Sequence, residues 1–171
     1  MDRQGNPSAE GPVFTRFATD TVSYTIQPAR YKVIVFVDFG GLHQLQAPVT
    51  QWKDLINEVD SLSETDIPFL FFFQTKNVSE IRHILRCDNF ANPVCIDTAD
   101  DLYKLNRFPS NMMFQTFLVD AGNRVKIIGN PIHNLSVKEL YLKEIAGIKS
   151  TVMVRYGHPT RFHRIPLRYS R

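Results

Sequence analysis

Two cysteines, Cys87 and Cys95, are the residues of this chain that could carry thiol chemistry. Neither lies in a metal-ligand spacing, and no histidine cluster accompanies them. Cys87 falls near the end of a predicted helix, and Cys95 falls inside an apolar strand. The two cysteines could form a structural disulfide or a redox pair. A buried Cys95 and a packed or partly exposed Cys87 are favoured over both. Neither follows a strand at a helix start, which is where reactive thiols of this kind are activated.

Histidines are the next candidates for chemistry. His43 follows an apolar strand, where an acid–base or metal-binding group would be exposed, but it has no evident partner, so an exposed loop histidine is favoured. His133 is expected to tie down a loop. His158 and His163 stand among arginines, without the carboxylates that a metal site there would need.

A small acidic cluster, Asp97, Asp100 and Asp101, allows two interpretations. It could bind a divalent cation through its carboxylate oxygens. It could also supply the acidic residues that the helix dipole favours at a helix amino terminus, which is the simpler explanation. No cofactor and no metal site are therefore expected.

Hydrophobic periodicity predicts the elements that position these residues. Alternating or continuous apolar runs predict strands at 22–26, 32–37, 68–73, 93–96, 114–119 and 125–128. Stripes at helical spacing predict helices at 52–62, 78–85, 98–106 and 136–147. Ser136 and Glu139 fit a capping box, and 120–123 fits a hairpin turn in which Gly122 and Asn123 suit positive φ. This order predicts an α/β protein with a mixed central sheet and helices on both faces.

Composition fits one globular domain, with 43% hydrophobic and 22% charged residues. The chain carries a net charge of +3, and residues 151–171 hold five arginines and no acidic residue. Such a tail could bind an anionic surface, although a loosely ordered terminus is the simpler interpretation. Nucleic-acid binding is not favoured, because no recognised motif accompanies the tail.

The longest apolar run, 67–73, is too short to cross a bilayer, so no membrane span is expected. Residues 1–12 are polar and show no signal peptide. The protein is either cytoplasmic or lost a leader before this chain was defined.

Residues 31–145 resemble the thioredoxin-like domains of the AhpC/TSA-type peroxiredoxin and thiol-disulfide oxidoreductase superfamily, in particular a poorly characterised subgroup of bacterial cell envelopes. The segments that carry the resemblance are 52–56, 68–73, 114–120 and 129–134. The resemblance implies a thioredoxin-like domain over 21–147, between a flexible leader at 1–20 and a basic extension at 148–171. It also implies a cell-envelope or periplasmic location.

The same resemblance places the redox site of the family on residues that cannot perform its chemistry. The attacking and resolving cysteines correspond to Leu42 and Leu45, and the usual cis-proline position falls near Met113 and Phe114. Thiol-disulfide exchange needs a thiolate, and leucine has nothing to ionise.

We therefore expect a redox-inactive protein that binds a protein or peptide partner through the former active face. The expected binding residues are Gly41, Leu42, His43, Leu45, Met113 and Phe114. The alternative is a thiol-disulfide oxidoreductase or peroxidase that uses Cys87 or Cys95. A third idea, binding of an anionic surface by the tail, predicts strong salt dependence.

Overall fold

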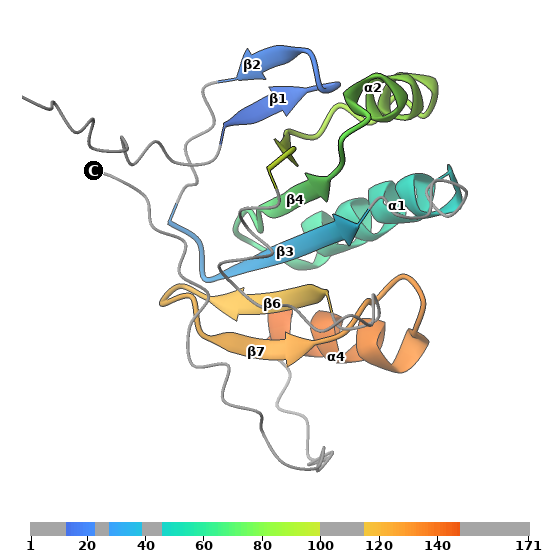
Figure 1. Cartoon of the computed structure of the whole chain (residues 1–171). Coiled ribbons are helices and arrows are strands. Elements are labelled where there is room, and N and C mark those ends of the chain that lie inside the picture. Colours follow the sequence, from blue (N-terminus) through green and yellow to red (C-terminus); the bar gives the residue numbers. More distant parts are fainter. Residues whose placement is uncertain (1–12, 23–27, 39–45, 100–114, 148–171) are drawn as a thin grey trace, which may run out of the picture.

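The β-branched and aromatic runs of the sequence form one seven-stranded sheet with the order β2-β1-β5-β4-β3-β6-β7 (Figure 1). The structure is a computed structural model and describes residues 13–22, 28–38, 46–99 and 115–147. Its strands are β1 (Phe14–Arg16), β2 (Asp20–Val22), β3 (Tyr31–Asp38), β4 (Phe69–Gln74), β5 (Val94–Asp97), β6 (Thr116–Asp120) and β7 (Val125–Ile128). Its helices are α1 (Gln46–Leu62), α2 (Val78–Cys87) and α4 (Leu135–Ile145).

The centre of the sheet is parallel and its margins are antiparallel. β3, β4 and β5 run in the same direction, while β6 and β7 on one side and β1 and β2 on the other run antiparallel to their neighbours. The crossovers through α1 and α2 both step outward from β3, so the right-handed rule places both helices on the same face. The mixed sheet and the α/β class predicted from the sequence are confirmed. The three described helices all pack on one face, so a helix on the other face stays a prediction.

Alternation along the strands divides the core into two clusters, one on each face of the sheet. On the first, here called the helix-covered face, Val33, Val35 and Phe71 pack with all three described helices; α1 contributes Trp52 and α4 contributes Tyr141. The opposite face, here called the second face, has its own buried cluster of seven strand residues. These are Phe14, Ile34, Leu70, Phe72, Cys95, Phe117 and Val119. The helix expected at 98–106 lies, apart from its first two residues, outside the described residues.

The hairpin of β1 and β2 was not expected, because both strands fall in or beside the range 1–20 assigned to a leader. Its turn contains neither glycine, asparagine nor proline, which are the usual turn signals. Instead Phe17 and Ala18 adopt φ values of 53° and 52°. Ala18 is buried, and its carbonyl accepts hydrogen bonds from the Arg82 guanidinium at 3.4 Å, which fixes the turn against α2. The strand expected at 22–26 has only Val22 within the described residues.

Asparagines cap two of the described helices. Asn77 caps α2 by accepting the backbone N–H of Glu80 at 3.3 Å. The predicted capping box at Ser136 and Glu139 is wrong, because Asn134 caps α4 and accepts the N–H of Val137 at 3.2 Å. An asparagine caps at least as well as a serine, so the helix begins where Asn134 is available.

In the predicted turn between β6 and β7, Asn123 adopts a φ of 59° but Gly122 does not adopt a positive φ. A Cβ on Gly122 would lie 3.3 Å from the Asp120 carboxylate, so close approach is the reason for glycine there. None of the helices in the described part of the chain is long and apolar enough to span a membrane.

Candidate functional site

The carboxyl ends of the parallel strands define the edge of the sheet where the sequence places the candidate site. β3 ends at Asp38 and α1 begins at Gln46, so residues 39–45 join the described part of the fold at this edge. The carbonyl of Gln115 accepts the N–H of Phe36 at 3.0 Å, which brings the residue preceding β6 to the same edge. Both segments with predicted site residues are therefore attached at one edge of the sheet.

The predicted site residues themselves lie outside the described residues. These are Gly41, Leu42, His43, Leu45, Met113 and Phe114. Their expected role as a binding surface stays a prediction. What the structure describes is the frame that carries them, which consists of β3, the start of α1 and the residue before β6.

The buried polar groups of this edge are hydroxyls and an amide held close to the sheet. Thr75, Gln115 and Thr116 are all buried. The Thr75 hydroxyl accepts the N–H of Asn77 at 2.9 Å, and the Thr75 N–H donates to the carbonyl of Asp97 at 3.3 Å. These groups order the edge but supply no thiol.

Cys95 lies in the interior of β5 and points into the second face, where only 6% of its surface is exposed. Its cluster includes the rings of Phe14 and Phe72, whose centroids are 5.7 Å apart. Burial, with a smaller contribution from Asp97, raises the pKa of the Cys95 thiol to about 12. A thiol with this pKa stays protonated near neutral pH and is a poor nucleophile. The expectation of a buried core thiol is confirmed.

Cys87 is the last residue of α2 and is exposed. Its sulfur lies 3.5 Å from Nε2 of His83, one helical turn earlier. α2 packs on the helix-covered face whereas Cys95 points into the second face, and both cysteines are free. The disulfide that the sequence left open is therefore absent.

The contact between His83 and Cys87 was missed in the sequence. Its signal was present, since the two residues are four apart within a stretch predicted as a helix, and this spacing puts side chains on one face. Among the residues that the structure describes, no group of three or more His, Cys, Asp or Glu side chains could hold a metal ion. Of the acidic cluster, only Asp97 is described, at the end of β5. His133 is exposed after β7, while His158, His163 and the basic tail lie outside the described residues.

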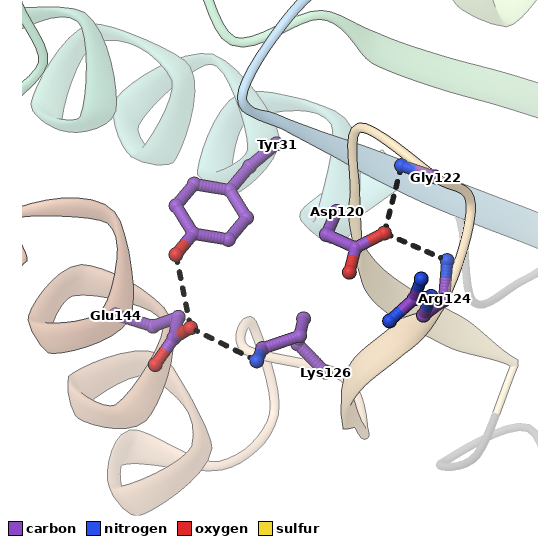
Figure 2. Close-up of polar contacts among 6 residues, drawn as sticks. All are labelled: Tyr31, Asp120, Gly122, Arg124, Lys126 and Glu144. Atoms are coloured by element: carbon purple, nitrogen blue, oxygen red, sulfur yellow. Dashed lines mark hydrogen bonds and ion pairs between the residues drawn. The ribbon is translucent and has the colours of Figure 1, made fainter.

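The opposite edge of the sheet carries a polar network (Figure 2). The Tyr31 hydroxyl donates to the Glu144 carboxylate at 3.0 Å, and the ammonium of Lys126 lies 3.7 Å from the same oxygen. The Arg30 guanidinium lies 5.1 Å from the centroid of the Tyr31 ring. Burial, followed by the Glu144 hydrogen bond, raises the pKa of Tyr31. This network joins α4 to β3 and β7, so its role is structural.

The adjacent hairpin turn is fixed by one carboxylate. Asp120 accepts the N–H groups of Gly122 at 2.8 Å and Arg124 at 3.0 Å, and the hydrogen bond from Arg124 holds the Asp120 pKa below its usual value (Figure 2). The buried Lys32 donates to the Asn123 side chain at 2.7 Å. Burial lowers the pKa of Lys32. Asp120 and Lys32 therefore stabilise the turn, and the described residues of this edge form no reactive centre.

Comparison with known proteins was informative at the level of structure. No protein-family model and no curated protein sequence matches the chain. A proposed thiol-disulfide oxidoreductase from Bacteroides vulgatus matches with a TM-score of 0.58 at 18% identity, covering 86% of this chain and 93% of its own.

Two further structures match at 14% identity with TM-scores of 0.51. A secreted disulfide oxidoreductase from Mycobacterium tuberculosis covers 80% of this chain and 95% of its own. An uncharacterised thioredoxin-like protein from Porphyromonas gingivalis covers 80% and 90%, respectively. At these identities the likeness concerns the backbone, and it shows that this chain has the thioredoxin-like fold found in thiol-disulfide oxidoreductases.

Proposed function

We propose that this protein is a redox-inactive member of the thioredoxin-like fold that binds a peptide or protein partner. The observation that carries the proposal is the position of the two cysteines. Cys87 ends α2, and Cys95 lies inside β5. Neither is at the junction of β3 and α1, where the fold places its reactive thiol.

The requirements of thiol-disulfide exchange support this proposal. The reaction begins with a thiolate, which a helix amino terminus stabilises. Cys87 stands at the carboxyl terminus of α2, not at a helix amino terminus. Cys95 is protonated and sealed from solvent. The junction between β3 and α1 carries Leu42 and Leu45, which have no ionisable group.

The proposed contact surface is the former active face, formed by Leu42, Leu45, Met113 and Phe114 with Gly41 and His43. Support comes from the sequence, which is apolar at these positions, and from the attachment of both segments to one edge of the sheet. Apolar side chains grouped at the surface are a common property of protein-binding sites.

A binding experiment tests this surface. The wild-type protein is applied to an array of short peptides, and the best binders are measured in solution with Leu42→Glu and Leu45→Glu variants. We expect each charge to weaken binding by about tenfold or more. Leu62→Glu is the matched control, because Leu62 is 46% exposed at the last residue of α1, the end of that helix farther from this edge. Equal binding by all variants would contradict the proposed surface.

The alternative function is a thiol-disulfide oxidoreductase or peroxidase that uses Cys87. The contact of Cys87 with His83 favours it, because an imidazole can take the proton of a thiol. The alternative predicts turnover that disappears in Cys87→Ser, whereas the binding function predicts no dependence on either cysteine. A cell-envelope location is part of the proposal and is supported by the family resemblance.

A further inference from the structure

We propose that the hairpin of β1 and β2 is a removable cover over Cys95. The hairpin opens as a unit while the rest of the described sheet stays folded, and this opening gives solvent access to the Cys95 thiol. β1 is the neighbour of β5 on the side away from β4, and β2 lies outside β1 at the edge of the sheet (Figure 1). The hairpin can therefore separate from β5 without breaking the pairing between any other described strands.

Cys95 lies between two phenylalanines, one of which belongs to the hairpin. In the register of the sheet, Cys95 is paired with Phe14 on β1 and with Phe72 on β4. Paired residues of neighbouring strands lie on the same face, and all three belong to the buried cluster of the second face. Phe14 is 3% exposed, and its ring meets the Phe72 ring edge-on. When the hairpin opens, Phe14 leaves with it, and one side of the thiol is uncovered.

The pairing that joins the hairpin to β5 is short. β1 pairs with β5 at Phe14 and Thr15, whereas β3 pairs with β4 at six positions. The Thr15 hydroxyl adds a hydrogen bond to the carbonyl of Val94 at 3.2 Å. Because local opening requires only the contacts of the opening unit to break, the hairpin should open at a lower free energy than the central strands.

The turn of the hairpin is held against α2 in a strained conformation. Phe17 and Ala18 adopt φ values of 53° and 52°, which residues with a Cβ rarely adopt. Arg82 donates to the carbonyl of Ala18 at 3.4 Å. Arg86 donates to the Thr19 hydroxyl at 3.3 Å, and both contacts are long for hydrogen bonds. Opening breaks these contacts and relieves the strain, whereas the burial of Ala18 favours the closed state.

The two states differ in what they offer to a reagent. In the closed state Cys95 is 6% exposed, and its thiol is protected. In the open state β5 becomes the edge of the sheet, and the thiol can react. The fold thereby carries a cysteine whose reactivity is set by the position of the hairpin, independently of the exposed Cys87.

Alkylation of the full-length protein by iodoacetamide, at urea concentrations below the unfolding transition, tests this opening. Peptide mass spectrometry gives the rate at Cys95. Opening of the hairpin exposes little surface, so the rate should rise by less than about twofold per molar urea. Reaction through global unfolding would raise it by at least about fivefold per molar. A slope equal to that of global unfolding would overturn the proposal, as would the absence of measurable alkylation of Cys95 below the transition.

Two variants test whether the contacts with α2 control the opening. Arg82→Ala/Arg86→Ala removes both contacts with the turn and should speed alkylation of Cys95 at least about tenfold. Tyr31→Phe is the matched control, because it removes a hydrogen bond between β3 and α4, and it should leave the rate within about twofold. If both variants speed alkylation in proportion to their loss of global stability, Cys95 is reached by global unfolding and the proposal is wrong. If the double variant does not fold, the urea dependence of the wild type decides.

Discussion

Cys87 and Cys95 are close in the sequence but occupy very different environments. Cys87 is exposed at the carboxyl end of α2, beside an imidazole. Cys95 lies within an apolar cluster on the second face of the sheet, and burial raises its pKa to about 12. The comparison teaches that a cysteine count says little about redox function in this fold. What matters is whether a thiol stands at the start of a helix, with solvent on one side.

Thiol reactivity should show the largest difference between the two positions. In the native protein, iodoacetamide should modify Cys87 at least about a thousandfold faster than Cys95, because Cys95 reacts only when the core opens. Mass spectrometry of peptides from a time course measures both rates in one sample. Comparable rates would mean that the environment of Cys95 is open, and the comparison would fail.

Replacement by serine should separate the two positions in stability. Cys95→Ser places a hydroxyl in an apolar cluster and should lower the free energy of unfolding by about 1–3 kcal/mol. Cys87→Ser exchanges one exposed polar group for another and should change it by less than about 0.5 kcal/mol. Urea unfolding followed by circular dichroism measures both values. Equal effects would contradict the assignment of one cysteine to the core and the other to the surface.

The dependence of stability on alkaline pH gives a second test of the burial of Cys95. Its thiol has a pKa of 9.0 when exposed and about 12 in the fold, so above pH 9 the unfolded chain loses a proton that the folded chain keeps. The Cys95 thiol makes its full contribution to the free energy of unfolding below pH 9, and this contribution is lost as the pH rises toward 12. Burial also raises the pKa of Tyr31 and Tyr141, so the wild type is compared with Cys95→Ala. The variant should lose less stability over this range, and parallel curves would contradict the assignment.

The smallest effect concerns the network at the opposite edge. Tyr31→Phe removes the hydrogen bond to Glu144 and should lower the free energy of unfolding by about 1 kcal/mol. Urea unfolding measures the loss. An unchanged free energy of unfolding would mean that this hydrogen bond does not stabilise the junction of α4 with β3.

Much of the fold could be predicted from periodicity. The apolar run of β4 and the stripe of Trp52, Leu55 and Val59 in α1 are strong signals, because buried strands and amphipathic helices have distinct periods. The hairpin of β1 and β2 could not be found in this way. Its turn uses Phe17 and Ala18 at positive φ and is held by contacts with α2, which are distant in sequence.

The candidate site could be predicted only in part. Leucine at the two positions where the resemblance places redox cysteines was visible in the sequence, as was the four-residue spacing of His83 and Cys87. The contact between the side chains of His83 and Cys87 was not, because it depends on side-chain conformations on a formed helix. The placement of Cys87 and Cys95 on opposite faces likewise needed the sheet topology.

The proposed function requires that this thioredoxin-like protein does not catalyse thiol-disulfide exchange. Its most direct test is dithiothreitol-driven reduction of insulin, measured for the wild type and for the Cys87→Ser/Cys95→Ala double variant, with a chelator present. We expect equal rates, both at the level of dithiothreitol alone. Turnover by the wild type well above that background, lost in the double variant, would contradict the proposed function.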